Sequence, residues 1–553
     1  MQEFYGNIID IFNQNIFYGK LLVEDTKIHS VEQISDTVLA DASYILPGFI
    51  DSHIHIESSL LTPSQFARMA VLHGTIATVS DPHEIANVCG VPGVQYMIDD
   101  AATTNFYFFF GAPSCVPATI YETAGAAISP SDTKLLLQQN DIWYLSEMMN
   151  FPGVLYNDAS VYQKIEAAIE IGKPIDGHAP GLRGADTKKY IYAGRESITI
   201  STDHECFTME EALDKLHHGM KIIIREGSAA RNFDALIPLL HDYPNQMMFC
   251  SDDKHPDSLL EGHINLLCKR AVAVGIDLFK VLRAACIIPA LHYSLPVGLL
   301  RPNDSADFII INNPVSFDIQ QVFIKGVCVA QDGISLLSSP KADTINRFAH
   351  IVFAKNQLRY VVSTAPISEK KLPIIVAEDG QLITGVEWIS PNIQNGEIIT
   401  DPDQDILKLV VVNRYASKAP SIALVKNFGL RHAALASTVA HDSHNIVAVG
   451  TDDDTLFAAI DAVIQSRGGL SHACVENEKM VTTILPLPVA GLMSNEDAWQ
   501  VAEAYIHLDQ KAKASGSKLR APFMTLSFMA LLVIPHIKLS DKGLFDGDRF
   551  CFY

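Results

Sequence analysis

Two histidines, His53 and His55, end the apolar run Ile45–His55. Side chains in a strand alternate between its two faces, so residues two apart project together. The pair would therefore point the same way, and two adjacent imidazoles can hold a divalent metal ion. A His-x-His pair taken alone is more often structural than metal-binding, with one ring solvated and the other in the core. The metal interpretation therefore depends on further ligands elsewhere in the chain.

Other residues suited to metal binding or proton transfer also stand at the ends of predicted strands. Each has an ordinary explanation, such as a helix N-cap, a core histidine or a solvated carboxylate. Their shared position at the same end of successive strands predicts a single site instead. The set comprises Asp81, His83, Glu84, Glu147, His178, His204, Glu205, Asp252 and Asp253.

The number of these residues is about what two metal ions need. We expect His53 and His55 to hold the first ion, and His178 and His204 to hold the second. Glu147 ends the fourth predicted strand, which lies between the strands of the two histidine groups, so its carboxylate could bridge both ions. Imidazole and carboxylate ligands without thiolate suit Mn, Fe or Zn, and such a pair of ions makes water a nucleophile at neutral pH.

Asp252 is predicted to complete the ligand set and to act in catalysis. It could take a proton from the activated water and pass it to a leaving group. Asp253 is the alternative, because adjacent strand residues point to opposite faces. His83 and Glu205 are further catalytic candidates, either supporting the ligands or facing the substrate.

Three more residues are candidates for the substrate pocket. Ser114 follows the third predicted strand, and Arg225 and Glu226 end the seventh. Ordinary loop polarity explains them equally well.

Strand-like apolar runs alternate with helix-like segments through the middle of the chain. Strands that are apolar throughout and alternate with helices indicate a parallel sheet. Eight such units in roughly 250 residues predict an α/β fold of the (β/α)₈ TIM-barrel type, with a doubly wound open sheet as the alternative. The predicted strands are Ile45–His55, Thr75–Asp81, Asn105–Ala112, Ile142–Glu147, Pro174–His178, Ser197–His204, Met220–Glu226 and Gln246–Asp252.

Short strands and turns flank the predicted barrel on both sides, and the economical interpretation is that they pair into one small composite β-sandwich. A further unit with mixed strands and helices follows, which we interpret as α/β or α+β. The expected boundaries are 1–45 with 296–340 for the sandwich, 46–295 for the barrel, 341–380 for a linker and 381–553 for the C-terminal unit.

The composition narrows the class of protein. Aspartate and glutamate (63) outnumber lysine and arginine (41), and the net charge of −22 argues against nucleic acid as a partner. Nine scattered cysteines without a C-x-x-C pair suit reduced thiols in the cytoplasm. We expect neither a signal peptide nor a membrane span, because the sequence has no basic segment followed by an apolar run at its start and no apolar run long enough to cross a bilayer. We also expect a homodimer, because homodimers are the commonest oligomers.

The sequence resembles the amidohydrolase superfamily. Residues Pro47–His55 match its opening motif, and the segment from Gly298 to Ile309 resembles its return to the composite sandwich. Cyclic-amide hydrolases of this superfamily usually carry a carboxylated lysine on the fourth strand, where this chain has Glu147. That difference points towards the bacterial adenine deaminase family.

Further segments are similar to that family over nearly the whole chain. They are Glu57–Ser59, Ser80–Val88, Asp176–Gly181, Ser251–Pro256, Ala440–Asn445 and Gly468–Gly469. The resemblance implies a binuclear Mn or Fe centre, with Zn possible, and purine salvage by conversion of free adenine and water to hypoxanthine and ammonia.

In the implied reaction, hydroxide produced at the metal centre attacks C6 of the purine and Asp252 relays a proton to the departing amine. Glu205 or His83 would contact or protonate a ring nitrogen. His441 and His444 are either a lid over the barrel mouth or part of a surface loop. Alternative functions are hydrolysis of another heterocycle or cyclic amide, or a non-catalytic barrel.

Overall fold

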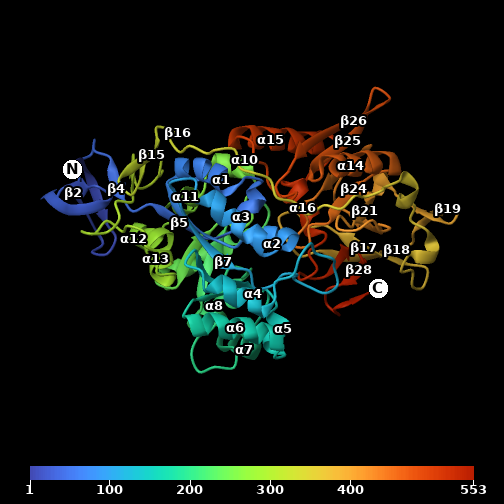
Figure 1. The fold of residues 1–553 in the computed structure, drawn as a ribbon, viewed down its shortest axis with the longest axis horizontal. Coiled ribbons are helices and arrows are strands. Elements are labelled where there is room, and N and C mark those ends of the chain that lie inside the picture. The colour runs from blue at the N-terminus through green and yellow to red at the C-terminus, as the bar shows by residue number, and fades with distance from the viewer.

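The computed structural model describes all of residues 1–553, and its centre is a barrel of eight parallel strands (Figure 1). The strands are almost entirely buried on both faces, as a parallel sheet covered by helices requires. The strands are β5 (Phe49–Ile54), β6 (Thr75–Ser80), β7 (Tyr107–Ala112), β8 (Ile142–Met148), β9 (Ile175–Gly177), β10 (Thr202–Asp203), β11 (Lys221–Arg225) and β12 (Met247–Cys250).

The barrel closes at two narrow seams between a five-stranded sheet, β5 to β9, and a three-stranded sheet, β10 to β12. At one seam the N–H of Ser201 donates to the carbonyl of Ile175 (2.8 Å). At the other, the N–H of Asp252 donates to the carbonyl of His53 (3.0 Å), and the N–H of His55 donates to that of Asp252 (3.2 Å). The TIM-type barrel is therefore confirmed, and the open-sheet alternative is wrong.

Helices surround the barrel strands. None of the helices combines the length and the apolar sequence that a membrane span needs. Thr208 caps one of them, accepting the N–H of Glu211 (3.2 Å). The helices are α1 (Pro63–Ala70), α2 (His83–Cys89), α3 (Val91–Ala101), α4 (Pro130–Leu137), α5 (Phe151–Leu155), α6 (Ala159–Ile171), α7 (Gly184–Tyr192), α8 (Met209–His217), α9 (Phe233–Leu236), α10 (Pro256–Glu261), α11 (Ile264–Ala273), α12 (Leu278–Leu282) and α13 (Ile288–His292).

Both flanks of the barrel segment contribute to one eight-stranded sheet, which lies at the left of Figure 1. The join is made by β4, which pairs with β1 on one side and with β13 on the other. The strands of this composite sheet are β1 (Gln2–Asp10), β2 (Asn15–Glu24), β3 (Lys27–Ser35), β4 (Tyr44–Leu46), β13 (Phe308–Ile311), β14 (Ile319–Ile324), β15 (Val327–Gln331) and β16 (Ile334–Ser335).

The stretch Ile45–His55, predicted as a single strand, is divided between two sheets. Its first part is β4 in the composite sheet, and its second part, from Phe49, is β5 in the barrel. Pro47 and Gly48 separate them, because proline cannot donate a ladder hydrogen bond and glycine weakens a strand. A Cβ at position 48 would also lie 2.5 Å from the side chain of Ile76, so the barrel approaches the backbone closely there.

The C-terminal part of the chain contains a second eight-stranded sheet, at the right of Figure 1, and three main helices. Its neighbours are antiparallel except for β17 and β22. In sheet order the strands are β18 (Gly385–Ile389), β17 (Leu372–Val376), β22 (Ser421–Lys426), β21 (Ile406–Val412), β24 (Ile446–Gly450), β23 (Ala433–Ser437), β25 (Gly469–Glu476) and β26 (Lys479–Pro486). The helices are α14 (Asp453–Ser466), α15 (Ala498–Ala514) and α16 (Pro522–Phe528), and the small sheets hold β19 (Asn392–Gln394), β20 (Glu397–Ile399), β27 (Ile537–Ser540), β28 (Gly543–Asp546) and β29 (Cys551–Phe552).

Part of the expected linker 341–380 belongs to this sheet. Strand β17 falls within it, and Phe348 and Leu358 are buried in the core under α14. We propose that the C-terminal unit extends from residue 348 to residue 553, and we keep the other predicted boundaries as proposals.

A buried ammonium group joins α8 to the ends of β9 and β10. Lys215 Nζ donates to the carbonyl of Ala179 (2.8 Å) and to the carboxylates of Asp203 (3.1 Å) and Glu211 (2.9 Å). Asp203 in turn accepts the N–H groups of Ala179 (3.0 Å) and Glu205 (2.7 Å). These contacts fix the backbone on either side of two candidate ligands, one on each strand.

Replacing Lys215 with methionine should lower the free energy of unfolding by about 3–5 kcal/mol, because two buried carboxylates lose their counter-charge. Urea denaturation followed by tryptophan fluorescence measures the change. The matched control is Lys513→Met, which breaks a partly exposed pair with Asp509 and should change stability by at most about 1 kcal/mol. Equal losses in the two variants would contradict the structural role of Lys215.

Candidate metal centre and substrate cavity

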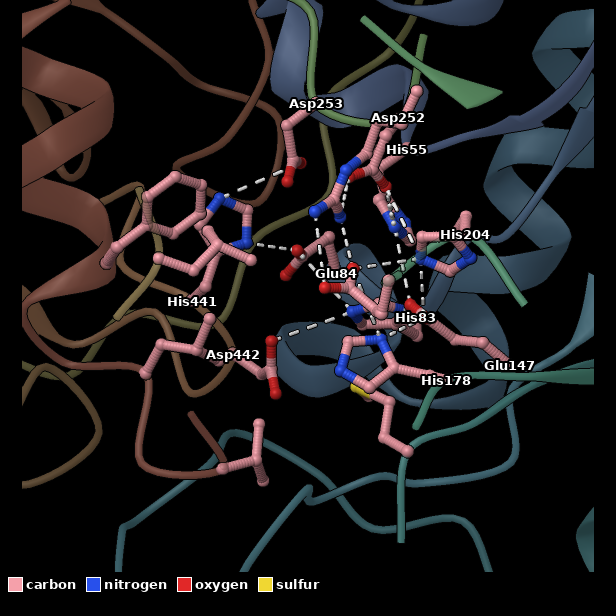
Figure 2. A pocket seen from close by; sticks show the side chains of 17 residues that line it. His55, His83, Glu84, Glu147, His178, His204, Asp252, Asp253, His441 and Asp442 are labelled. Carbon is pink, nitrogen blue, oxygen red and sulfur yellow. Dashed lines mark hydrogen bonds and ion pairs between the residues drawn. The ribbon is translucent and has the colours of Figure 1, made fainter. Parts of the chain in front are cut away.

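The carboxyl ends of the barrel strands face the C-terminal unit across a cavity, which Figure 2 shows from close by. One wall is polar and comes from the barrel, and the other is largely apolar and comes from the C-terminal unit. The barrel residues are His55, His83, Glu84, Glu147, Met149, His178, His204, Glu205, Arg225, Asp252 and Asp253. The C-terminal residues are Leu382, His441, Asp442, Phe528, Leu531 and Val533.

His53 and His55 project together from the end of β5, as the period of a strand predicts. Their Nε2 atoms are 3.2 Å apart, and both rings are buried. The Nδ1–H of His55 donates to the carbonyl of Asp81 (3.1 Å), which leaves the lone pair of His55 Nε2 free. The backbone contact thus fixes this ring in the tautomer that a metal ligand requires.

The carboxylate of Glu147 divides its two oxygens between two groups of imidazoles (Figure 2). Its Oε1 lies 3.3 Å from His55 Nε2 and 3.4 Å from His83 Nδ1. Its Oε2 lies 2.7 Å from His178 Nδ1 and 3.3 Å from His204 Nε2. Burial raises the pKa of Glu147, but the surrounding histidines outweigh burial and hold the pKa well below its usual range. One carboxylate thus contacts both groups of imidazoles.

Asp252 completes one of these groups. Its Oδ1 lies 3.4 Å from His53 Nε2 and 3.3 Å from His55 Nε2, and it lies 3.9 Å from His204 Nε2. Its Oδ2 accepts a hydrogen bond from Arg225 Nη1 (2.9 Å). One oxygen therefore faces the imidazoles while a guanidinium holds the other.

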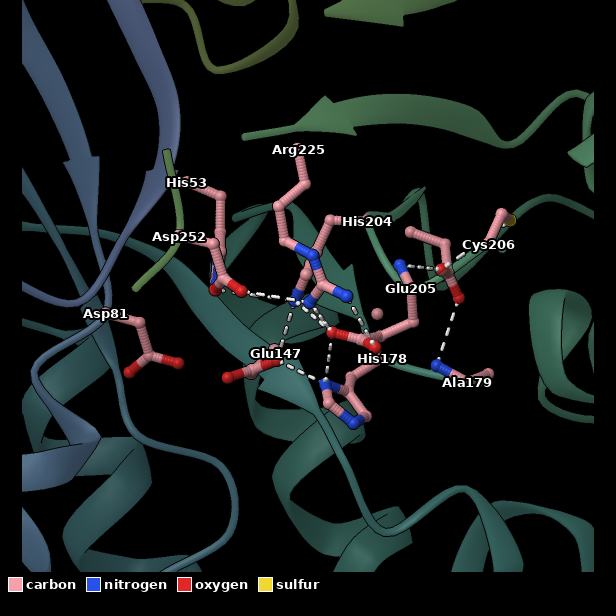
Figure 3. Close-up of polar contacts among 12 residues, drawn as sticks. His53, Asp81, Glu147, His178, Ala179, His204, Glu205, Cys206, Arg225 and Asp252 are labelled. Carbon is pink, nitrogen blue, oxygen red and sulfur yellow. Dashed lines mark hydrogen bonds and ion pairs between the residues drawn. The ribbon is translucent and has the colours of Figure 1, made fainter. Parts of the chain in front are cut away.

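The buried guanidinium of Arg225 also forms a two-pronged pair with Glu205 (Figure 3). Burial alone would raise the pKa of Glu205, but Arg225 and His178 overcome it and lower the pKa to about 2. Glu205 Oε1 lies 3.3 Å from His204 Nε2 and thus beside the second imidazole group.

The donor atoms around His53 and His55 are spaced for a divalent cation, and His178, His204 and Glu205 form a further group of potential ligands. Ligands of a tetrahedral ion with bonds of about 2.1 Å lie about 3.4 Å apart, close to the 3.2–3.4 Å separations among His53, His55, Glu147 and Asp252. Six carboxylates but only one guanidinium line the cavity, and buried carboxylates need compensating positive charge. Several histidine nitrogens, among them His178 Nε2 and both of His83, are buried without a hydrogen-bond partner.

A second imidazole–carboxylate cluster joins the barrel to the C-terminal unit. Glu84 binds His441 Nδ1 with one oxygen and His444 Nε2 with the other. The N–H of Ala440 donates to His444 Nδ1 (3.2 Å), so this nitrogen is unprotonated and the proton of His444 resides on Nε2. The tautomer favours a hydrogen-bonded cluster over a third metal site, because a proton occupies the nitrogen that faces Glu84.

His441 lines the cavity, so the lid interpretation fits the structure and the surface-loop interpretation does not. Burial lowers the pKa of His441, but Glu84 and Asp253 outweigh it and raise the pKa to about 9. Asp253 accepts a hydrogen bond from Ser58 (2.5 Å) and lies 3.9 Å from His441 Nε2. Of the two neighbouring aspartates, Asp252 is thus the one that faces the imidazoles of the barrel.

Further buried contacts hold the ligand-bearing strands in place. Asp51 accepts from the N–H of Ser251 (3.0 Å) and from His263 Nε2 (2.8 Å), which fastens the seam between β5 and β12. The Tyr190 hydroxyl donates to the carbonyl of Met148 (2.8 Å) and accepts from the N–H of His178 (2.9 Å). A sequence does not display such contacts, because the partners are far apart along the chain.

Of the three predicted pocket residues, the structure brings only Arg225 to the cavity. The hydroxyl of Ser114 binds the backbone carbonyl of Glu147 and lines a separate pocket. Glu226 pairs with Arg270 (2.5 Å) outside the cavity, because adjacent strand residues point to opposite faces. Asp442 was not predicted, although it lies within the segment Ala440–Asn445, and Leu382, Phe528, Leu531 and Val533 carry no signal in the sequence.

Comparisons with solved structures give distant likenesses over about 60% of the chain. A β-aspartyl dipeptidase from Fervidobacterium islandicum AW-1 is 14% identical with a TM-score of 0.45, covering 60% of this chain and 96% of that protein. A molinate hydrolase is 12% identical with a TM-score of 0.44, covering 63% and 98%. Scores this low do not bear on the fold or the function of the chain.

Family models and full-length relatives are more informative. The amidohydrolase family model matches residues 44–329, and the model of the adenine deaminase C-terminal domain matches residues 381–551. Adenine deaminases of Salinibacter ruber and Sulfurovum sp. are 50% and 51% identical, each over at least 99% of this chain and 97% and 99% of their own lengths. That of Methanosarcina mazei is 48% identical over 100% of this chain and 99% of its own. The chain therefore belongs to the adenine deaminase family of the amidohydrolases.

Proposed function

We propose that the protein hydrolyses free adenine to hypoxanthine and ammonia, and so serves purine salvage. The observation that carries the proposal is the pair of imidazole groups joined by Glu147 at the floor of the cavity. Relatives named adenine deaminase share about half of the sequence over their full length.

We propose that the barrel holds two ions, with Mn²⁺ or Fe²⁺ the best candidates and Zn²⁺ a further one. His53, His55 and Asp252 would hold the first, His178 and His204 the second, and Glu147 both. Ions held there would make a water molecule nucleophilic at neutral pH.

Asp252 is placed to move the protons of the reaction. Addition of water to C6 releases a proton, and departure of ammonia from that carbon consumes one. Asp252 Oδ1 lies 3.3–3.9 Å from the Nε2 atoms of His53, His55 and His204, which belong to both imidazole groups. Arg225 donates a hydrogen bond to Oδ2 and so restrains the carboxylate. We propose that Oδ1 takes the first proton and delivers the second, and that either Glu205 or His83 contacts a ring nitrogen near C6.

We also propose a cellular location, a class of partner and an oligomeric state for the enzyme. Nine cysteines without a disulfide suit a cytoplasmic protein. A cavity closed by the C-terminal unit and lined with carboxylates suits a small base rather than nucleic acid. We also keep the expectation of a homodimer.

Metal-loaded protein should release ammonia from adenine, with adenosine, guanine and dihydroorotate as comparison substrates. The experiment is a coupled ammonia assay on protein reconstituted with Mn²⁺ or Fe²⁺, alongside the metal-free form. Release from adenine only after loading is the expected result. A preference for another of these compounds would show that the chain is an amidohydrolase of different specificity.

Glu147→Ala should abolish the two-ion stoichiometry, because the carboxylate shared by both imidazole groups is gone. Elemental analysis after dialysis should give about two ions per chain for the wild type and clearly fewer for the variant. Glu226→Ala, which alters a carboxylate outside the cavity, is the control and should retain both ions. Two ions in Glu147→Ala would remove Glu147 as the bridge.

Asp252→Asn should keep its metal but lose turnover by about 10²-fold or more, the range for a lost proton-transfer group. The amide retains an oxygen ligand but cannot accept a proton at neutral pH. Ammonia release and metal content measured on the same sample separate the two effects. Full activity would assign proton transfer to another residue.

A further inference from the structure

The apolar wall of the cavity presents two polar atoms that have no hydrogen-bond partner within the protein, although one of them, His441 Nε2, lies 3.9 Å from a carboxylate oxygen of Asp253. His441 Nε2 and Asp442 Oδ2 are both buried and make no hydrogen bond. Both residues lie on the connection between β23 and β24 and line the cavity opposite the imidazole groups (Figure 2). Leaving such atoms unpaired is unfavourable by about 1–3 kcal/mol each, or more for charged groups, so their position indicates that a ligand pairs with them.

Contacts on the side of the His441 ring away from the cavity fix its orientation. Its Nδ1 binds Glu84, which His444 binds in turn, and the ring lies 5.1 Å from that of Phe528 between centroids. Because Nδ1–H is used by Glu84, only Nε2 remains for the cavity. Nearby Glu84 and Asp253 favour the protonated ring, so Nε2 is a donor.

Asp442 is held beside the barrel wall. Its Oδ1 lies 3.7 Å from His83 Nε2, whereas Oδ2 has no hydrogen-bond partner. The wall therefore offers one hydrogen-bond donor, at His441, and one acceptor, at Asp442.

The far edge of adenine complements this pair. Deamination requires C6 and its amino group to face the candidate metal residues, so the opposite edge, with N3 and N9, faces the C-terminal unit. N3 is an acceptor, and N9–H is the one donor of the free base besides the departing amino group. A sugar at N9 would remove that donor and meet the wall formed by residues such as Phe528 and Leu531.

We infer that His441 and Asp442 are positioning residues that bind the edge of the purine remote from C6, with His441 donating to N3 and Asp442 accepting from N9–H. The inference rests on the proposed deamination of adenine and extends it. It makes the C-terminal unit responsible for selecting the free base over its nucleoside.

The test for Asp442 compares adenine with 9-methyladenine, which lacks the N9–H donor. In Asp442→Ala, kcat/KM for adenine should fall about 10- to 100-fold, as for a lost hydrogen bond to a charged group. For 9-methyladenine it should change by no more than about threefold or rise, because that substrate never made the bond. Asp403→Ala, at an exposed carboxylate paired with Arg431, is the matched control and should behave as wild type.

The corresponding test for His441 uses 3-deazaadenine, which has carbon in place of N3. His441→Asn should lower kcat/KM for adenine about 10- to 100-fold and leave the already low value for 3-deazaadenine nearly unchanged. His536→Asn, at a half-exposed ring paired with Asp548, is the control.

Metal content and thermal unfolding of each variant show whether the fold is retained, and Asp442→Leu, which also lacks an acceptor, replaces Asp442→Ala if the latter does not fold. Equal losses for adenine and its analogue in a folded variant would overturn the inference. Wild-type protein that binds two ions but releases no ammonia from adenine would instead overturn the proposed function, and the inference with it.

Discussion

The site depends on the placing of one buried carboxylate between two groups of imidazoles. Each oxygen of Glu147 faces a different group, so an error of even one residue in the register of β8 would turn the side chain away from both. The surrounding strands must therefore be fixed to within a fraction of an ångström. Tyr190 does this for β8 and β9, and Asp51 does it for β5 and β12.

The same concentration of charge explains why these supports are themselves polar. Lys215 meets two buried carboxylates, and Arg225 meets Glu205 and Asp252. In a low-dielectric interior such pairs hold their geometry because breaking one leaves an uncompensated charge. Fixed cations thus hold the framework of the barrel, whereas Glu147 at its centre is paired with imidazoles alone.

The barrel side of the site was predictable because it obeys local rules. Period-two alternation places His53 and His55 on one face, and the common end of parallel strands gathers Glu147, His178 and His204. The same alternation, applied to the seventh strand, would have separated Arg225 from Glu226, although the sequence alone does not say which of the two faces inward. The break at Pro47 and Gly48 was visible in the sequence but lay inside a motif that reads as one apolar run.

The far side was not predictable, because it comes from docking of one folded unit on another. His441 and Asp442 approach Glu84 and His83 from more than 350 positions away along the chain, and no periodicity reports such a contact. A barrel of this kind supplies activation of water at its strand ends, which many amidohydrolase substrates could use equally. Rejection of close analogues requires buried polar atoms that the wrong ligand leaves unpaired. In the proposed reaction, the chemistry and the selectivity for the substrate thus reside on opposite walls of the cavity. The wall that sets selectivity can change while Glu147 and the histidines around it keep their positions.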